Sequence, residues 1–316
     1  MVLFSCGCGY IGGVQPPLAN IPKNPTDLAV VQRGGFIYAH VKLPEMTTEL
    51  IPIKDDLEID LRAGITPDPW SEAAWLAKAS KVPVTSVKDG VASFEFPTAQ
   101  WTGKDITVAA RAFGPNGKPS GWSNIVGLPI VAPLPKVTGV VLTPTAKGMR
   151  VTWHDEAKQF RILRQTEGTP GFTEVGTSTT PEFLDTTAEF GKTYHYMVQS
   201  FAGLGNHLEA QGEFSDAATM LYKDTFPPAT PTGVRATSSS TTVELSWDAN
   251  AEPDLAGYRV YRSVDGGAFA KIADIGEIPT YSDRDVQSGK TYRYSIAAID
   301  KDGNESEKSA AVEATL

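Results

Sequence analysis

Cysteine is nearly absent from this chain of 316 residues. The only two cysteines, Cys6 and Cys8, lie at the N-terminus, so the rest of the chain cannot form a disulfide bond and must be stabilised by packing. A structural zinc site needs about four ligands. The four histidines are scattered: His40, His154, His195 and His207. From these absences we expect no metal site and no cofactor.

Basic charge and long apolar runs are also scarce. The 28 Lys and Arg residues are outnumbered by 37 Asp and Glu, which gives a net charge of −9. Nucleic-acid binding requires a basic surface, so this class of partner is excluded. No apolar run approaches the roughly 20 residues that cross a bilayer as a helix.

Motifs of catalysis are missing as well. The sequence has no Gly-x-Ser-x-Gly, no glycine-rich phosphate loop and no His-Glu-x-x-His. The one compact polar group that contains a histidine is His154-Asp155-Glu156, and its place after Trp153 predicts a solvated turn. We therefore expect that the chain is not an enzyme.

An internal repeat is the strongest feature that is present. Asp283 is followed by Gly-Lys-Thr-Tyr-Arg-Tyr at 289–294, and Asp185 is followed by Gly-Lys-Thr-Tyr-His-Tyr at 191–196. The spacing from Asp to Gly and to Tyr is the same in both copies. Neighbouring segments align too: 243–247 with 149–153, 258–262 with 160–164, and 269–273 with 172–176.

These segments are short, alternate apolar with polar residues and end at Gly, Pro, Asp or Asn. Such a pattern is typical of strands with one buried face. Several strands at intervals of roughly 8–12 residues favour an antiparallel sandwich over a helical or βαβ fold. Residues 132–316 are therefore predicted to contain two copies of an all-β domain.

The repeated residues resemble the fibronectin type III domain in its bacterial surface-protein form. The resemblance lies in Trp153 and Trp247 near the start of each copy and in the Tyr-x-Tyr strand after Gly-Lys-Thr. It also includes the sequence segments at 254–262 and 300–306. It covers residues 132–316 and implies an immunoglobulin-like sandwich. It implies little about a ligand, because this fold serves many functions.

The first third of the chain is a looser copy. Residues 36–41 and 57–62 are predicted strands, and Gly103–Val108 stands where the other copies have Gly-Lys-Thr-Tyr-x-Tyr. Ile106 replaces the tyrosine, so a tyrosine-corner hydrogen bond should be absent here. Residues 119–124 resemble the start of a last strand.

One helix is expected within this copy, over 68–80. Asp68 is a suitable N-cap and Pro69 suits the first helical position. The fold class predicted from sequence is all-β: three tandem fibronectin type III-like sandwiches in an elongated array, with this short helical insertion in the first. The expected domains are a tether at 1–24 and sandwiches at 25–131, 132–224 and 225–316, joined by proline-rich spacers.

The N-terminus resembles the lipobox of bacterial lipoproteins, in which Cys6 or Cys8 would be the lipidated residue. Only five residues precede Cys6, whereas a signal peptide needs a charged start and an apolar stretch of roughly 7–15 residues. The resemblance therefore implies a true start upstream of Met1. The chain would then be extracytoplasmic, on a bacterial cell envelope or surface, with the lipid anchor as its only membrane contact; the other interpretation is an ordinary N-terminal tail.

Five residues are candidates for binding a protein or glycan partner: Trp70, Trp75, Leu204, His207 and Leu208. Tryptophan is a favoured anchor, and Trp70 beside Pro69 is expected to be the most exposed. The competing interpretation is that Trp75, Trp101 and Trp122 pack inside the first domain. The leucines belong to the loop at 203–208, and loops on this scaffold carry binding function. The other interpretations are that they cover the end of their domain or contact a neighbour.

Acidic residues alternate with spacers at 300–305, which superficially suggests a calcium loop. The Asp-Gly-Asn order between two strands predicts a hairpin turn instead. The leading functional hypothesis is a non-catalytic envelope or surface lipoprotein that acts as a spacer and as a protein- or glycan-binding scaffold. The alternative is an accessory module or subunit of a larger secreted glycan-active or adhesion assembly.

Overall fold

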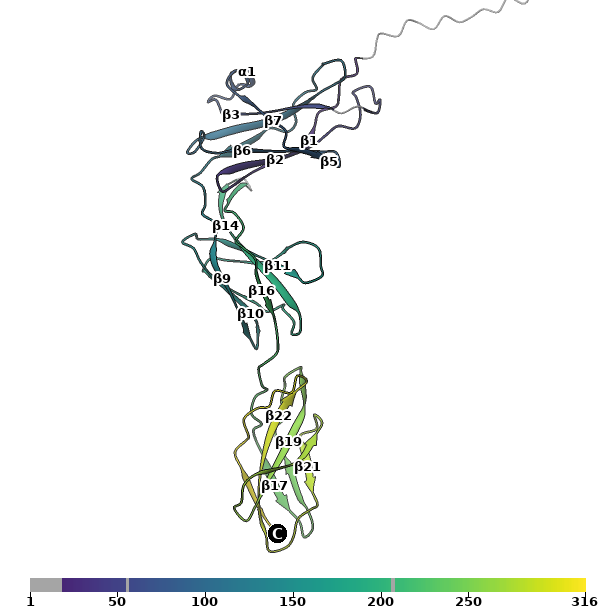
Figure 1. Cartoon of the computed structure of the whole chain (residues 1–316), viewed down its shortest axis with the longest axis vertical. Coiled ribbons are helices and arrows are strands. Elements are labelled where there is room, and N and C mark those ends of the chain that lie inside the picture. The colour runs from purple at the N-terminus through teal and green to yellow at the C-terminus, as the bar shows by residue number, and fades with distance from the viewer. Residues whose placement is uncertain (1–18, 55–56, 206–207) are drawn as a thin grey trace, which may run out of the picture. The chain divides into compact units, whose positions relative to one another are not determined.

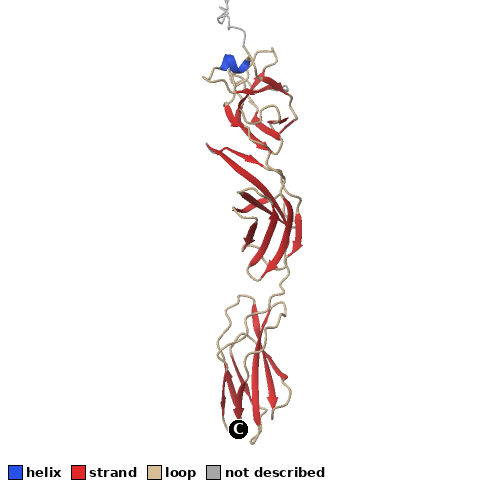
Figure 2. Ribbon diagram, turned by 90° about the vertical axis from the view of Figure 1, so that its left-hand side faces the viewer, coloured by secondary structure: helices blue, strands red, loops and turns tan. Residues whose placement is uncertain are grey.

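Strands make up nearly all of the regular structure. The computed structural model describes residues 19–54, 57–205 and 208–316 (Figure 1). Among these residues α1 (Glu72–Leu76) is the one α-helix, drawn in blue among red strands in Figure 2. The predicted all-β class is confirmed. Cys6, Cys8 and His207 lie outside the described residues.

The described chain divides into two compact units. The first comprises residues up to Leu142 together with Val151–Phe183 and His195–Thr219, and the second comprises Thr143–Arg150, Leu184–Tyr194 and Met220–Leu316. Segments of the predicted middle domain therefore belong to both units. The domain boundaries derived from the sequence stay predictions.

Two sheets face each other in the N-terminal sandwich of the first unit. One contains β1 (Thr26–Arg33), β2 (Phe36–Lys42), β6 (Val91–Pro97) and β5 (Ser86–Lys88) in that order. The other contains β4 (Ser80–Val82), β3 (Glu58–Ile65), β7 (Asp105–Phe113) and β8 (Val126–Pro129). Alternate residues of these strands point inward, and Ile37, Leu61, Phe94 and Ile106 are buried in the shared core.

The first of these sheets continues past β1. Strand β15 (Leu208–Gln211) runs parallel to β1, with Gln32 opposite Ala210. Beyond it lie β14 (Thr193–Gly205), β11 (Phe160–Thr166) and β12 (Thr173–Ser178), while β16 (Ala218–Leu221) pairs with β14. Strands β13 (Glu182–Asp185), β10 (Gly148–His154) and β9 (Thr138–Thr145) form a separate sheet.

The C-terminal sandwich belongs to the second unit and is coloured green to yellow in Figure 1. One sheet has the order β17 (Arg235–Ser238), β18 (Val243–Ser246), β21 (Thr280–Asp283). The other has the order β20 (Ala270–Ile275), β19 (Leu255–Val264), β22 (Thr291–Asp300), β23 (Val312–Thr315). Trp247, Tyr258, Tyr294 and Ile296 pack in the core between them.

The repeated tryptophans occupy matching surroundings. Trp153 meets Phe160 edge-on at 5.0 Å between ring centroids, and Trp247 meets Tyr258 edge-on at 5.1 Å. Both indoles are buried, and neither indole N–H has a hydrogen-bond partner among the described residues. Their predicted role as core residues is confirmed.

The repeated tyrosines make the corner hydrogen bond that the resemblance implied. The backbone N–H of Glu189 donates to the hydroxyl of Tyr194 (2.9 Å), and that of Gln287 donates to the hydroxyl of Tyr292 (2.8 Å). At the corresponding place in the N-terminal sandwich Ile106 is fully buried, so an apolar contact replaces the polar one.

A pair of serines relates the N-terminal and C-terminal sandwiches. Ser120 and Ser123 accept hydrogen bonds from backbone N–H groups of β7 (3.0 and 3.1 Å), and Ser306 and Ser309 accept them from β22 (2.9 and 3.0 Å). These hydroxyls satisfy strand donors where the last edge of the sheet is irregular. The N-terminal domain is thus a divergent copy, as its tail residues had suggested.

The helix is much shorter than the predicted span of 68–80. Its N-cap is Ser71, whose side chain accepts from the backbone N–H of Ala74, and not Asp68. Ser80 belongs to β4, where it lies opposite Ala63 of β3. Pairing with the sheet therefore outweighs the helix propensity of the alanine-rich sequence.

Candidate functional site

A cluster of three tryptophans surrounds the short helix of the N-terminal sandwich. Trp75 is buried and its indole N–H donates to the carbonyl oxygen of Thr107 (3.1 Å). Trp70 lies beside it at 6.1 Å between ring centroids, and Trp122 meets it edge-on at 5.4 Å. Trp70 is 46% exposed, so one indole of the cluster is available to a partner.

Charged groups fix the base of this cluster. Asp60 is 1% exposed and pairs with two guanidinium groups, Arg62 at 2.7 Å and Arg111 at 3.0 Å. Arg111 also lies 4.6 Å from the centre of the Trp122 ring, a cation–π contact. The Trp122 indole donates to Glu72 of the helix (2.9 Å). These contacts hold Trp122 against Trp75, the ring on which Trp70 packs.

The structure separates the tryptophans that the sequence had grouped. Trp101 is buried against Phe96, at 5.6 Å between ring centroids, and Trp75 is 1% exposed. Trp75 as a binding residue is thereby corrected: it packs the helix against the sheet and cannot touch a partner. The expected exposure of Trp70 is found, and its binding role stays a prediction.

The two candidate leucines of the middle segment are partly buried. Leu204, near the end of β14, and Leu208, at the start of β15, pack against the core cluster of the N-terminal sandwich. They therefore contact the core of a neighbouring sandwich in the first unit, which was one of the expectations for these leucines. A free partner would have only their remaining exposed surface to contact.

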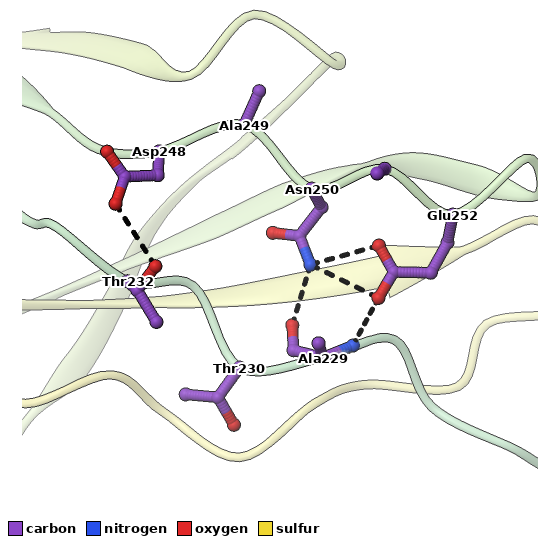
Figure 3. A pocket seen from close by; sticks show the side chains of 8 residues that line it. Ala229, Thr230, Thr232, Asp248, Ala249, Asn250 and Glu252 are labelled. Atoms are coloured by element: carbon purple, nitrogen blue, oxygen red, sulfur yellow. Dashed lines mark hydrogen bonds between the residues drawn. The ribbon is translucent and has the colours of Figure 1, made fainter.

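A surface pocket of about 460 Å³ lies at the start of the C-terminal sandwich, and Figure 3 shows the side chains that line it. The Asn250 amide donates to the carbonyl of Ala229 (2.8 Å), and the Ala229 N–H donates to Glu252 (2.6 Å). Burial raises the pKa of Glu252, but the hydrogen bonds that its carboxylate accepts, from the Ala229 N–H and also from the Asn250 amide, outweigh burial and hold the pKa below its ordinary value. The polar groups thus mostly close a loop and offer little to a ligand.

Two histidines contact hydroxyl groups, which a nucleophile–base pair would also require. His40 Nδ1 lies 3.0 Å from Ser93 Oγ, and His195 Nδ1 lies 2.7 Å from Thr219 Oγ1. His40 and Ser93 are directly opposite residues of β2 and β6, so their contact follows from the register of the ladder. Both contacts are solvent-exposed and need no catalytic role to explain them.

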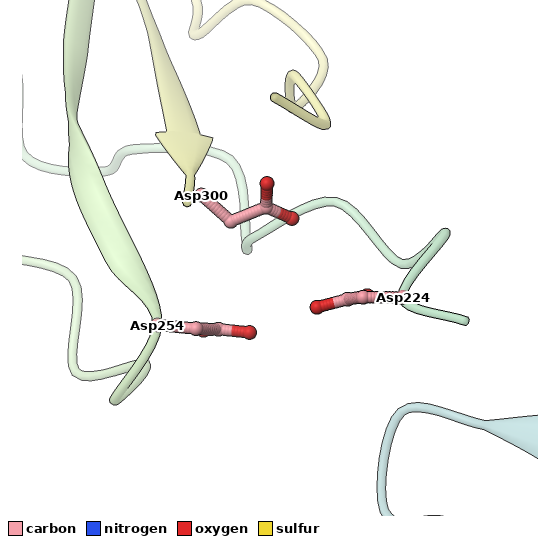
Figure 4. A group of neighbouring side chains, drawn as sticks. All are labelled: Asp224, Asp254 and Asp300. Carbon is pink, nitrogen blue, oxygen red and sulfur yellow. The ribbon is translucent and has the colours of Figure 1, made fainter. Parts of the chain in front are cut away.

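Three aspartates converge at one end of the C-terminal sandwich (Figure 4). Asp224, Asp254 and Asp300 each place a carboxylate oxygen within 4.8 Å of the others. The predicted turn at 300–305 is present, with Ile299 bridged to Glu305. Asp300 nevertheless meets two residues far away in sequence instead of Asp302. Sequence reasoning missed this group, since Asp224 stands in a spacer and Asp254 in a loop.

Within the described residues no helix is long and apolar enough to cross a membrane. No family model matches the chain. It is 30% identical over 149 residues to exoglucanase B of Cellulomonas fimi, which covers 46% of this chain and 13% of that protein. It is 42% identical over 88 residues to an amylopullulanase of Thermoanaerobacterium saccharolyticum, covering 28% of this chain and 7% of that protein. The chain thus spans a small part of these relatives.

A third similarity is to a solved structure, a Fn3-like protein from Clostridium thermocellum. The two are 35% identical with a TM-score of 0.25, and the match covers 28% of this chain and 92% of that one. The shared sequence thus extends over nearly the whole of that relative. The repeated tryptophans and tyrosine corners are features of the fibronectin type III-like β-sandwich, the fold class that the described residues show.

Proposed function

We propose that the chain is a non-catalytic accessory segment of an extracytoplasmic glycan-active protein or assembly, in which the sandwiches act as spacers and Trp70 contacts a glucan. The observation that carries the proposal is the small matched share of the relatives: 13% of an exoglucanase and 7% of an amylopullulanase. A sandwich that recurs as a small part of two large glucan-active enzymes is an accessory module, separate from the part that performs their reactions.

The surface of the N-terminal sandwich supports the glucan contact. Sugars stack on flat aromatic faces, and an indole loses little conformational entropy when it is already held in place. Trp70 has both properties, since it is 46% exposed and lies against the buried Trp75. A protein partner would contact the same indole. Binding to a pure glucan polymer distinguishes a glucan partner from a protein partner.

The test is depletion of the purified chain by insoluble cellulose and by starch granules. We expect binding to at least one polymer and a loss of roughly tenfold or more for Trp70→Ala, because removing a stacked aromatic costs about 1–3 kcal/mol. Ile278→Ala is the matched control, since Ile278 is 72% exposed in the other unit. Sugar released by the chain alone would contradict the non-catalytic role, and equal binding by Trp70→Ala would contradict the contact.

We also propose that lipid attachment at Cys6 or Cys8 holds the segment on a bacterial envelope or surface. This rests on the lipobox-like N-terminal sequence Leu-Phe-Ser-Cys-Gly-Cys at 3–8. Metabolic labelling with a fatty acid in a bacterial host, using the gene with its upstream sequence, should mark the protein. A label that survives replacement of both cysteines would contradict the anchor.

A further inference from the structure

Three carboxylates from distant parts of the second unit meet at one point. Asp224 precedes the prolines Pro227 and Pro228, Asp254 lies just before β19, and Asp300 is the last residue of β22. Asp224 is 3% exposed and Asp300 is 2% exposed, and Asp254 is half-buried. Such a concentration of negative charge away from water is unfavourable unless a cation or a bound proton compensates it.

The hydrogen bonds around the cluster leave one oxygen unused. Asp224 Oδ1 accepts from the N–H of Phe226 (3.0 Å), and the two oxygens of Asp300 accept from the backbone and side chain of Asn304 (both 2.8 Å). Asp224 Oδ2 is buried and has no hydrogen-bond partner among the described residues. In Figure 4 one oxygen of the Asp224 carboxylate faces Asp254.

Within residues 19–54, 57–205 and 208–316, no Lys, Arg or His side chain forms an ion pair with Asp224, Asp254 or Asp300. The nearby ammonium group of Lys301 donates to the carbonyl of Pro253 (3.2 Å). Burial first, and then the neighbouring Asp254 and Asp300, raise the pKa of Asp224 above its ordinary value, against the N–H of Phe226. Among the described residues no positive charge therefore compensates the three carboxylates, and without a cation the repulsion is relieved by a proton on Asp224.

The donor set selects the kind of ion. Calcium binds oxygen ligands at roughly 2.3–2.6 Å, so two of its ligands are at most about 5 Å apart. The three aspartate oxygens all lie within 4.8 Å of one another, so a single ion can reach all of them. Zinc favours nitrogen and sulfur, and magnesium demands closer octahedral geometry. We propose that Asp224, Asp254 and Asp300 form a calcium site.

Calcium at this place would join the proline-rich segment to the C-terminal sandwich. Asp224 belongs to the segment before the first strand of the sandwich, whereas Asp254 and Asp300 belong to the sandwich itself. An ion bound by all three replaces mutual repulsion with attraction. The site therefore makes the folding and the rigidity of this segment depend on calcium, a property separate from any glucan contact.

The test is calorimetric titration and thermal unfolding of the full chain. After treatment with EDTA, titration with Ca²⁺ should show one ion bound per chain at this site, and 1 mM Ca²⁺ should raise the unfolding midpoint of the C-terminal sandwich by several degrees. Mg²⁺ at the same concentration should give a smaller rise. No binding and no shift with Ca²⁺ would overturn the proposal, and an equal shift with Mg²⁺ would overturn the choice of ion.

Asp224→Asn is the decisive variant, because the amide keeps the acceptor for the Phe226 N–H and removes one buried charge. It should weaken Ca²⁺ binding at least tenfold, yet in EDTA its unfolding midpoint should equal or exceed that of the parent chain. Asp302→Asn is the matched control, since Asp302 is exposed in the adjacent turn. Asp254→Asn provides a second loss-of-binding variant if Asp224→Asn folds poorly. Unchanged affinity in both cluster variants, or an equal loss in the control, would contradict the site.

Discussion

The middle segment and the C-terminal sandwich share a framework and differ at its ends. The repeat offset is 98 residues (283 − 185), so Asp300 corresponds to Ala202 and Asp254 to Glu156. The shared openings at Pro135 and Pro231 give an offset of 96, which aligns Asp224 with Leu128. The middle copy therefore lacks the three-aspartate group, although its tryptophan and tyrosine corner match those of the C-terminal copy.

The strands that carry these positions also end differently. Strand β22 stops at Asp300 and turns back, with the N–H of Asp300 donating to Asn304 (3.2 Å). Strand β14 continues past Ala202 to Gly205 and pairs with β15, which in turn pairs with β1. The same buried core of tryptophan and tyrosine thus accepts two different loops. The C-terminal copy has an acidic turn after β22, and the middle copy has the β14–β15 hairpin, which extends a sheet.

The largest expected effect tests whether the two frameworks are equivalent. Trp153→Ala and Trp247→Ala should each lower the free energy of unfolding of their own sandwich by about 3–5 kcal/mol, because each removes a buried indole and leaves a cavity. Urea unfolding followed by circular dichroism measures both. Ile278→Ala, at a position that is 72% exposed, is the control and should change stability by less than about 0.5 kcal/mol. A difference above roughly 2 kcal/mol between the two core variants would break the equivalence.

A smaller effect is expected at the tyrosine corners. Tyr194→Phe and Tyr292→Phe each leave a backbone N–H without the hydroxyl acceptor seen at 2.9 and 2.8 Å. Each should therefore cost about 0.5–1.5 kcal/mol of stability. The same urea experiment measures the loss. An effect at one corner only would show that the two hydrogen bonds, although alike in geometry, contribute unequally to stability.

The smallest expected effect is a pH dependence of stability that only the copy with the three aspartates should show. The pKa of Asp224 is raised in the folded chain, chiefly by burial and then by its two acidic neighbours, so the folded state holds the proton more tightly than the unfolded state. In EDTA the stability of the C-terminal sandwich should therefore fall as pH rises from the ordinary aspartate range through that raised pKa. Unfolding midpoints at a series of pH values measure it; Ca²⁺ or Asp224→Asn should flatten the fall, and a rise with pH would contradict it.

The fold was largely predictable from local pattern. Alternation of apolar and polar residues identified the strands, and the repeated Trp153 and Trp247 identified the core, because burial of one strand face is encoded at a period of two residues. The helix was less predictable: its alanines favour a long helix, yet Ser80 pairs with Ala63 and ends it early. Local propensity carries no information on such a partner.

The candidate sites depended much more on contacts between distant segments. Trp70 and Trp75 are five residues apart, yet one is 46% exposed and the other 1% exposed, because only Trp75 faces the sheet and its Thr107 carbonyl. Similarly, Asp302 looked as suitable for an ion as Asp300. The turn geometry directs only Asp300 toward Asp224 and Asp254.

The sequence by itself determined that this protein is built of β-sandwiches with tryptophan-centred cores, because strand periodicity and repeated residues are properties of neighbours along the chain. Only the tertiary structure decided which tryptophan faces solvent. It also decided that the carboxylates of Asp224 and Asp300, 76 residues apart, lie together in one buried cluster. Such contacts arise from strand pairing and loop packing, which bring together residues far apart in the chain. The sequence around each residue does not predict which distant residue it will meet.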